Sequence, residues 1–508
     1  MRFINLTLAI AMCGPAADAC TGVYVGRKLT EDGATWIART VDDRPLGLWH
    51  RFEVTPRQVT PTNRIYCGCR GFRRALPKET WRYVSTPRAR SFGNGRFVCL
   101  GMNEKGLSLT ATVTAFTRKE VLDIDPFVPT GAAEESLPEY LIASSATAAE
   151  AVDNLAKAMA ENGSFDGNIY MFADQREAWY VETYSGHEWA AVRMPEDKMA
   201  TFGNQFMLGE VEPDADGFRC SPGLFGLIEK AGTGVKGPSG RIHLAASLAV
   251  PLYDFGNLRS WWGHRWFAPE SAGEYRTDRR LDLFFAADGK VTKRAVFEFM
   301  RSRYEGTAWF PDTEKRGDIR TVGVETQVDE HLIAVHPDRP PHLAATAWVA
   351  FAPCEHSAFF PVSSATTGFD PDWESDSPSG ADRSWRERKA AGAVLRRLGT
   401  LARIDRIRLG AGVRDYWRDV ERRHLAAWPK VEAAALSCGD ENLAARIMTD
   451  YTVAAQREIY AAAVRITDDL LDYLDDNTET MTWRVIKGGV GIEPGKPIPP
   501  FAVKGGTK

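Results

Sequence analysis

The chain has 508 residues, more than one hydrophobic core usually holds, so we expect two structural parts. Its 63 basic and 67 acidic residues leave a net charge of only −4, which argues against nucleic acid or an anionic membrane as a main partner. Fifteen tryptophans and 25 phenylalanines indicate a large aromatic core or an apolar cleft and argue against a disordered chain.

The first 19 residues have the features of a secretory signal peptide. Arg2 supplies the positive charge, a short apolar stretch covers residues 3–12, and Ala17-Asp18-Ala19 has the small residues that signal peptidase requires. The apolar stretch is too short to cross a bilayer, and no run of about 20 apolar residues follows it. We therefore predict a signal peptide at 1–19 and a soluble mature chain without a membrane span, exported to the periplasm or the medium.

Cleavage after Ala19 would make Cys20 the first residue of the mature chain. Its α-amine, with an ordinary pKa of about 7.7–8.0, could then act as the general base for its own thiol. The alternative is that Cys20 forms a disulfide, which an exported compartment permits. Of the 8 cysteines, Cys13 lies in the leader, so an odd number remains and at least one is unpaired within the monomer.

Clusters of strand signals and runs of helix signals follow Cys20 along the chain. Alternating patterns predict a hairpin over 21–39, a strand over 107–113 and a three-stranded meander over 169–172, 178–182 and 189–193. Capping residues predict a helix from Thr147 to about Gly163 and another from Thr292 to Tyr304. Clustered strands with helices between them favour an α+β layered fold.

The composition changes near residue 370. A segment rich in Pro, Ser and Asp covers 369–380, and apolar residues recur at helical spacing from Ser384 to about Asp476. We predict a catalytic domain over 20–368 and a helical C-terminal region over 369–508 packed on it. The arginines between 396 and 408 alternate with leucine and isoleucine, which indicates a solvated helix face and not a nucleic-acid site.

Several segments resemble the bacterial cysteine dipeptidases of the dipeptidase A type, in the N-terminal-nucleophile hydrolase superfamily. They include Cys20-Thr21, Gly101 to Leu107, Glu177 to Thr183, Gly186 to Ala191, Gly203 to Phe206, Tyr304 to Thr307 and Trp348 to Pro361. The resemblance covers roughly residues 20–480, and its segments occur in the family's order. It implies a four-layer αββα sandwich and hydrolysis of an amide bond.

The resemblance also implies roles for residues near the nucleophile. Arg39 and Asp42 have the Arg-x-x-Asp spacing of related hydrolases. Arg39 could lower the pKa of the Cys20 thiol, and Asp42 could hold the Cys20 α-amine or a substrate amine. The alternative for both is a surface salt bridge after a hairpin.

Asn204 follows a predicted strand end, where the superfamily has an asparagine that donates to the oxyanion. The alternative is a turn residue after Gly203. Arg259 is the best match to a superfamily arginine near the substrate. The relatives' second oxyanion asparagine has no counterpart near Thr112, so no side chain is assigned to that role.

The sequence thus predicts an exported cysteine peptidase that acts on dipeptides, with a small peptide as its partner and possible assembly into a homo-oligomer. No cofactor or metal is expected, because no His or Cys pair has zinc spacing and no phosphate-binding loop is present. One alternative is an acylase that cleaves N-acyl amides such as penicillin V or bile-salt conjugates. The other is a non-catalytic binding protein with the same fold.

Overall fold

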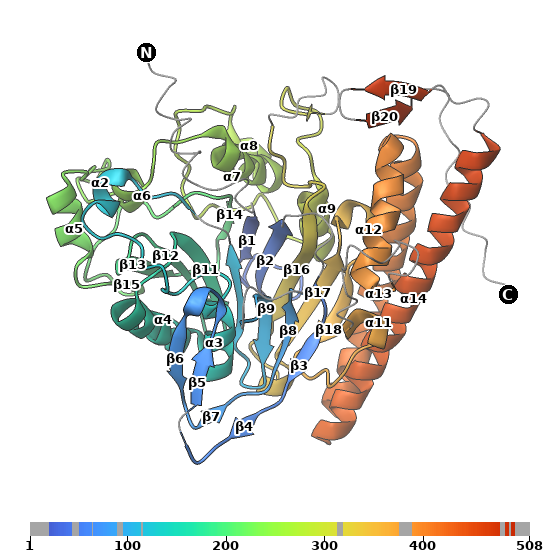
Figure 1. The fold of residues 1–508 in the computed structure, drawn as a ribbon, viewed down its shortest axis with the longest axis horizontal. Coiled ribbons are helices and arrows are strands. Elements are labelled where there is room, and N and C mark those ends of the chain that lie inside the picture. Colours follow the sequence, from blue (N-terminus) through green and yellow to red (C-terminus); the bar gives the residue numbers. More distant parts are fainter. Residues whose placement is uncertain are drawn as a thin grey trace.

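Two antiparallel β-sheets face each other at the centre of the molecule (Figure 1). The structure is a computed structural model that describes residues 20–42, 50–62, 64–88, 95–112, 115–311, 319–374, 389–477, 483–486 and 489–492. The signal peptide predicted at 1–19 lies outside these residues.

The first sheet has six strands, and the predicted nucleophile, Cys20, directly precedes one of them. In order across the sheet they are β14 (Met199–Phe202), β1 (Thr21–Val25), β2 (Thr35–Asp42), β16 (Gln327–Val335), β17 (Ala345–Phe351) and β18 (Phe360–Ser363). The predicted hairpin over 21–39 is confirmed as β1 and β2. Its return strand continues to Asp42, and this extension places Arg39 and Asp42 on the same strand.

The second sheet has eight strands. In order they are β15 (Phe218–Cys220), β13 (Trp189–Arg193), β12 (Ala178–Thr183), β11 (Asn168–Ala173), β10 (Ser108–Thr112), β9 (Val98–Asn103), β8 (Tyr83–Pro87) and β3 (Glu53–Thr55). The predicted meander is confirmed as the neighbouring strands β11, β12 and β13, and the strand predicted over 107–113 is β10. Three small ribbons pair β4 (Gln58–Val59) with β7 (Glu79–Thr80), β5 (Arg64–Cys67) with β6 (Arg73–Leu76), and β19 (Trp483–Ile486) with β20 (Gly489–Ile492).

The eight-stranded sheet is buried on both faces, as β11 illustrates. Ile169 and Met171 belong to the main core, whereas Tyr170 and Phe172 belong to a second core under the helices. Because successive side chains of a strand point to opposite faces, one strand serves both cores. Helices α3 (Leu137–Ser144) and α4 (Ala148–Asn162) cover the second core, and the Thr147 side chain caps α4 as predicted.

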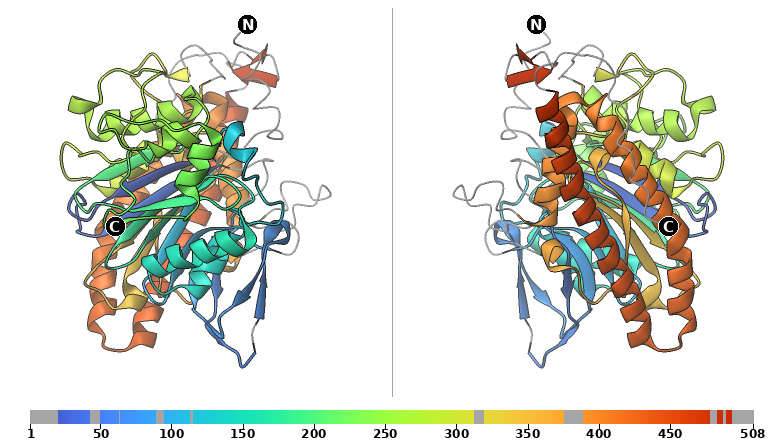
Figure 2. Two further views of the ribbon diagram at one scale, coloured as in Figure 1. Left: turned by 90° about the vertical axis from the view of Figure 1, so that its left-hand side faces the viewer. Right: turned by 90° about the vertical axis from the view of Figure 1, so that its right-hand side faces the viewer.

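Another helical layer covers the six-stranded sheet. It contains α7 (Asp254–Phe267), α9 (Lys293–Arg301), α12 (Ala391–Ala402), α13 (Leu409–Ser437) and α14 (Glu441–Asp476), and Figure 2 shows α14 along the outside of the molecule. The remaining helices are α2 (Lys119–Leu122), α5 (Leu224–Ala231), α6 (Leu244–Leu248), α8 (Pro269–Ala272), α11 (Pro371–Glu374) and the 3-10 turns η1 (Cys69–Gly71), η2 (Pro341–Leu343), η3 (Cys354–His356) and η5 (Arg403–Asp405). The predicted α+β fold with four αββα layers is confirmed.

The helix predicted from Thr292 is shorter than expected. It ends at Arg301 instead of Tyr304, because Ser302 has an extended backbone and Tyr304 a positive φ of 66°. The Ser302 hydroxyl accepts a hydrogen bond from Trp262 Nε1 at 2.7 Å, which holds the chain away from the helical path. The Tyr304 backbone conformation is uncommon for a residue with a Cβ, so local packing must compensate for it.

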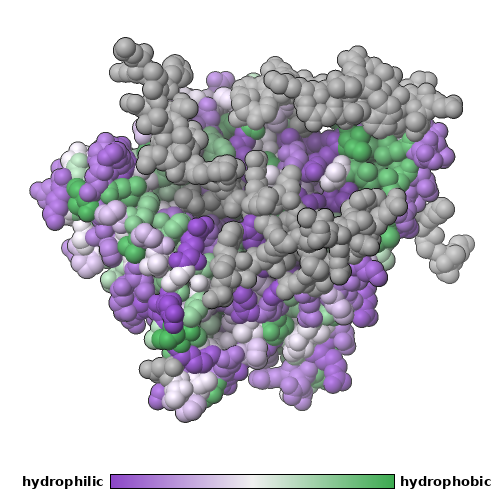
Figure 3. All heavy atoms as spheres, in the orientation of Figure 1, coloured by the Kyte–Doolittle hydropathy of each residue, from purple (hydrophilic) through white to green (hydrophobic). Residues whose placement is uncertain are grey.

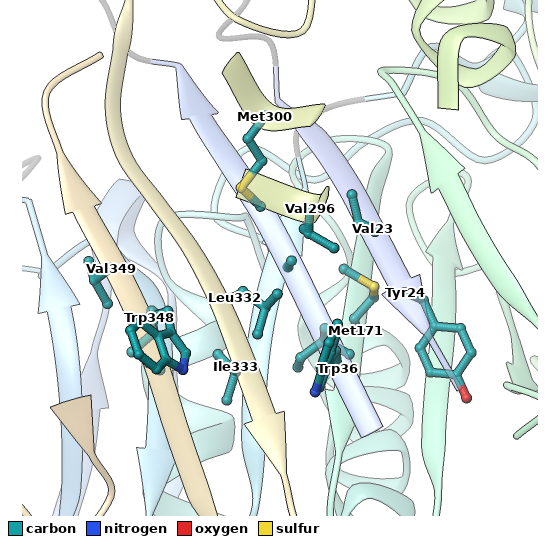
Figure 4. Packing of buried hydrophobic residues seen from close by; sticks show 14 of the residues in the cluster. Val23, Tyr24, Trp36, Met171, Val296, Met300, Leu332, Ile333, Trp348 and Val349 are labelled. Carbon is teal, nitrogen blue, oxygen red and sulfur yellow. The ribbon is translucent and has the colours of Figure 1, made fainter. Parts of the chain in front are cut away.

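The C-terminal helices share the main core with the six-stranded sheet. One cluster of buried hydrophobic side chains extends from β1 to α14, and Figure 4 shows its part around Trp36, Leu332, Ile333, Trp348, Val296 and Met300. The helical character predicted for 384–476 is confirmed by α12, α13 and α14. The domain division at residue 368 stays a prediction.

Among the residues coloured in Figure 3, more are hydrophilic than hydrophobic, and smaller hydrophobic patches lie among them. Within the described residues, no helix is long and apolar enough to cross a membrane. The seven cysteines from Cys20 to Cys438 all have free thiols, so none of them forms a disulfide.

Candidate active site

Cys20 lies immediately before β1 and is fully buried. The register of β1 and β2 pairs Gly22 with Arg39. Since Cys20 and Gly22 are two residues apart, they share a face, and Arg39 reaches Cys20 along the diagonal. The Arg39 Nη2 atom donates to Cys20 Sγ at 3.0 Å.

Opposing effects act on the pKa of the Cys20 thiol. Burial raises this pKa far above its ordinary value, and the Arg39 guanidinium lowers it. The carboxylates of Glu134 and Asp42 raise it further, whereas a hydrogen bond from the Asp42 backbone N–H lowers it. With residues 1–19 attached, the net effect on this pKa is an increase, which favours the neutral thiol.

Asn204 and Arg259 meet beside the backbone of Cys20. Arg259, on α7, donates from Nη2 to Asn204 Oδ1 at 2.6 Å and from Nη1 to the Cys20 carbonyl at 2.5 Å. An arginine can only donate, so the Asn204 side-chain oxygen must face it and the amide nitrogen is turned elsewhere. Arg259 therefore orients Asn204 as a hydrogen-bond donor.

A glycine before Asn204 allows this approach. A Cβ added to Gly203 would lie 2.9 Å from the Arg259 Cζ atom, closer than real Cβ atoms come to a neighbour. The sequence motif Gly203-Asn204 therefore has a steric reason, because the guanidinium occupies the space that any other side chain would need.

The Arg259 guanidinium is buried among uncharged acceptors. Besides Asn204 and Cys20, it donates to the Thr21 hydroxyl at 3.2 Å and the Phe255 carbonyl at 2.9 Å. Burial, together with the positive charge of Arg320, lowers its pKa to about 10. Such a cation favours an anion in its surroundings, for example a substrate carboxylate or a developing oxyanion.

Asp42 lies at the end of β2 with its carboxylate nearly inaccessible to solvent. It accepts a hydrogen bond from Arg320 Nη2, and Arg320 in turn interacts electrostatically with Arg259. The structure thus brings all five predicted site residues into one neighbourhood: Cys20, Arg39, Asp42, Asn204 and Arg259.

Comparison with known proteins identifies the family of the chain. A family model described as peptidase family C69 matches residues 19–384. This chain belongs to peptidase family C69.

Several curated relatives have the name "Probable dipeptidase B", and two of them illustrate the similarity. The one from Lactococcus lactis subsp. lactis is 30% identical over 343 residues, which are 66% of this chain and 72% of the relative. The one from Streptococcus pyogenes serotype M1 is 29% identical over 383 residues, 72% of this chain and 76% of the relative. A solved conjugated bile acid hydrolase from Clostridium perfringens aligns with a TM-score of only 0.24 and 14% identity, over 36% of this chain and 52% of its own, which is too low to bear on the fold.

Two charged residues of the candidate site in this C69 peptidase could not be predicted from the sequence. Glu134, on the segment before α3, accepts a hydrogen bond from the same Arg39 Nη2 atom that contacts the thiol. Arg320 pairs with Asp42. Neither lies in a motif or at an informative spacing, because both reach the site from segments distant in sequence.

A buried polar network lies next to Arg39 in this C69 peptidase. His331, on β16, is the cross-strand neighbour of Arg39, and its Nδ1 atom lies 2.9 Å from Asp329 Oδ1. Asp329 also contacts His50 Nδ1 at 3.0 Å, and His331 Nε2 lies 2.9 Å from the Thr110 hydroxyl on the facing sheet. Burial alone would raise the pKa of Asp329, but the two histidines outweigh burial and lower it. The network therefore connects the two sheets beside Arg39.

Glu182 anchors the segment that follows Asn204. Its buried carboxylate accepts hydrogen bonds from Tyr180 at 2.7 Å, Tyr184 at 2.8 Å and the Leu208 backbone N–H at 3.2 Å. Burial raises its pKa to about 7, although these donors oppose the shift.

Within the described residues, no group of three or more His, Cys, Asp or Glu side chains is arranged to hold a metal ion.

Proposed function

We propose that this C69 peptidase is an exported dipeptidase whose nucleophile is the thiol of an N-terminal Cys20. The observation that carries the proposal is the surrounding of Cys20: Arg39 donates to the sulfur, and the Arg259–Asn204 pair lies against its carbonyl. The dipeptidase names of the two curated relatives support the substrate class. The family match begins at residue 19, one residue before Cys20, which supports a mature chain that starts there.

In the proposed reaction, removal of residues 1–19 frees the Cys20 α-amine. This amine takes the thiol proton, and the sulfur attacks the scissile carbonyl carbon to form a C–S bond. Asn204 donates from its amide nitrogen to the resulting oxyanion. The C–N bond then breaks, the ammonium of Cys20 returns the proton to the leaving amine, and water hydrolyses the thioester.

The remaining residues adjust charge around these steps. Arg39 stabilises the thiolate, because a cation at hydrogen-bond distance favours the charged form of the sulfur. Asp42 contributes its backbone N–H to the sulfur and its carboxylate to Arg320. Arg259 compensates for negative charge that develops next to Asn204.

The test compares two purified forms of the same chain, one that begins at Cys20 and one that retains a single alanine before it. Only the first should hydrolyse dipeptides, because the second has no free amine on Cys20. Equal thermal unfolding of the two forms is the control for folding. Full activity of the blocked form would refute the N-terminal mechanism.

A substrate panel separates peptidase from acylase. It should contain free dipeptides, their N-acetylated counterparts and penicillin V. Faster hydrolysis of the acylated compounds would assign the chain to N-acyl amides and retain Cys20 as nucleophile. Export is tested separately, from the N-terminal mass of the protein recovered outside the cytoplasm.

A further inference from the structure

The Glu134 carboxylate and the Cys20 sulfur contact the same side chain, Arg39. Arg39 Nη2 donates to Cys20 Sγ at 3.0 Å and also to Glu134 Oε1. Two hydrogen bonds that share one nitrogen place the carboxylate oxygen no more than about 6 Å from the sulfur. Glu134 is therefore near the position of a bound substrate's reacting carbonyl group.

The geometry of a free dipeptide matches this distance. Its scissile carbonyl belongs to the N-terminal residue, so the α-ammonium nitrogen lies only two bonds, about 2.5 Å, from the carbon under attack. With a near-attack distance of about 3–3.5 Å between sulfur and carbon, the ammonium lies about 4–6 Å from the sulfur. In an N-acylated substrate, an uncharged amide occupies this position.

We propose that Glu134 binds the α-ammonium group of the substrate and thereby restricts hydrolysis to the bond after a free N-terminal residue. This inference rests on the proposed dipeptidase function and names a residue that determines its specificity. The Glu134 side chain is largely buried, with 8% of its surface exposed, so an ammonium bound there is shielded from water. A charged hydrogen bond is stronger in such surroundings than at an exposed site.

Other negative charges lie close to Glu134. Arg39 contacts Glu134 through the same nitrogen that contacts the thiol. Glu135 and Asp166 add negative charge nearby. Burial raises the pKa of Asp166, and the charges of Glu135 and Glu134 raise it further.

Binding of an ammonium at Glu134 would also affect the nucleophile. The negative charge of Glu134 raises the pKa of Cys20, whereas Arg39 lowers it. An ammonium beside Glu134 offsets that negative charge, so the effect of Arg39 on the thiol increases. A substrate with a free amine therefore promotes formation of the thiolate that attacks it, and an acylated substrate does not.

The variant Glu134→Gln tests both consequences, because glutamine keeps an oxygen for Arg39 but removes the charge. We expect kcat/KM for free dipeptides to fall about 10- to 100-fold, as for loss of a charged hydrogen bond, with no decrease for N-acetylated dipeptides. We also expect the pH midpoint of Cys20 alkylation by iodoacetamide to decrease. The matched control is Glu135→Gln, since Glu135 pairs with Arg70 and not with Arg39.

If Glu134 only holds Arg39 in place, the variant should show a different pattern of hydrolysis and alkylation. Loss of that support would reduce hydrolysis of free and acetylated dipeptides equally and increase the alkylation midpoint, and either result would overturn the inference. A measurement on the unmodified enzyme covers the case in which the variant does not fold. Leucinamide should inhibit at least about 10-fold more strongly than N-acetyl-leucinamide, and equal inhibition would overturn the inference.

The proposed function and this inference fail in distinguishable ways. A mature enzyme that hydrolyses no dipeptide refutes the proposed function and, with it, the role of Glu134. An enzyme that hydrolyses free dipeptides but keeps its preference over acetylated ones in Glu134→Gln refutes the role of Glu134 alone.

Discussion

Two buried arginines have opposite electrostatic surroundings in two regions of the molecule. Arg259, beside Cys20, donates only to uncharged acceptors, and its pKa is lowered to about 10 by burial and by Arg320. Arg301 lies between the six-stranded sheet and α13, where Glu421 accepts from two of its nitrogens. Burial opposes the charge of Arg301 too, but Glu421 outweighs it and raises the pKa.

The difference separates structural charges from functional ones. Arg301 also donates to the carbonyls of Cys354 at 2.7 Å and Ser357 at 3.1 Å, so its charge and its donors are compensated within the chain. Arg259 lacks a carboxylate among these acceptors, which costs folding free energy unless a ligand or a transition state supplies the negative charge. We therefore propose that Arg301 contributes to stability and Arg259 to the reaction.

The largest expected effect concerns the buried ion pair between Arg301 and Glu421. Glu421→Gln should lower the free energy of unfolding by about 3–5 kcal/mol, because it leaves the Arg301 charge buried without its partner. Chemical denaturation measures this loss, and kcat of the folded fraction should not change. The control is Glu458→Gln, which affects an exposed pair with Arg423 and should cost no more than about 1 kcal/mol. Equal losses in the two variants would contradict the assignment.

The next effect concerns the partner of Arg259. Asn204→Ala should lower kcat about 10²- to 10³-fold with little change in KM, as expected for loss of one oxyanion donor. Steady-state kinetics on a free dipeptide measures both constants, and thermal unfolding should match that of the unmodified enzyme. A normal kcat would transfer the oxyanion role to another group.

A pair of arginine substitutions tests the comparison directly. Arg259→Met should lower kcat/KM about 10- to 100-fold and should lower the free energy of unfolding by less than Arg301→Met does, because no buried carboxylate loses its partner. Arg301→Met should cause the larger loss of stability and leave kcat/KM of the folded fraction unchanged, since it leaves Glu421 unpaired. If both variants lose stability to the same extent, the distinction between the two regions is wrong.

The smallest effect is a pH dependence of stability in the Arg301 region. His356, in η3, is fully buried, and burial and the nearby Arg414, Arg403, Arg406 and Arg301 lower its pKa well below 6.5. Above pH 6.5 the folded and unfolded states are both neutral at this residue. Below it, only the unfolded chain binds the proton, so the free energy of unfolding should fall by about 1.4 kcal/mol per pH unit.

The measurement for His356 is a difference between two proteins. Denaturation of the unmodified chain and of His356→Gln should be compared at several pH values below 6.5, because other histidines titrate in both. The variant should lack the contribution of this residue and show a smaller slope. Identical slopes would mean that His356 already binds a proton in the folded state.

Local sequence patterns were sufficient for some of the strands and helices, and they indicated Cys20 as the candidate nucleophile. The alternation over residues 21–39 predicts the hairpin, and the hairpin explains why Arg39 can reach Cys20. The capping residue Thr147 predicts where α4 begins. The helix from Thr292 was predicted too long, because its end depends on a contact between Ser302 and Trp262.

Sequence alone determined those features of the site that depend on spacing along one strand or turn, namely Cys20, Arg39, Asp42 and the Gly203-Asn204 motif. Only the tertiary structure decided which charges meet there. Glu134 and Arg320 come from segments far along the chain, and the sequence does not distinguish them from the many other charged residues. The physical reason is that side-chain periodicity acts over a few residues, whereas a hydrogen bond or ion pair needs its atoms within about 3–4 Å, and only packing of the sheets and helices provides that proximity.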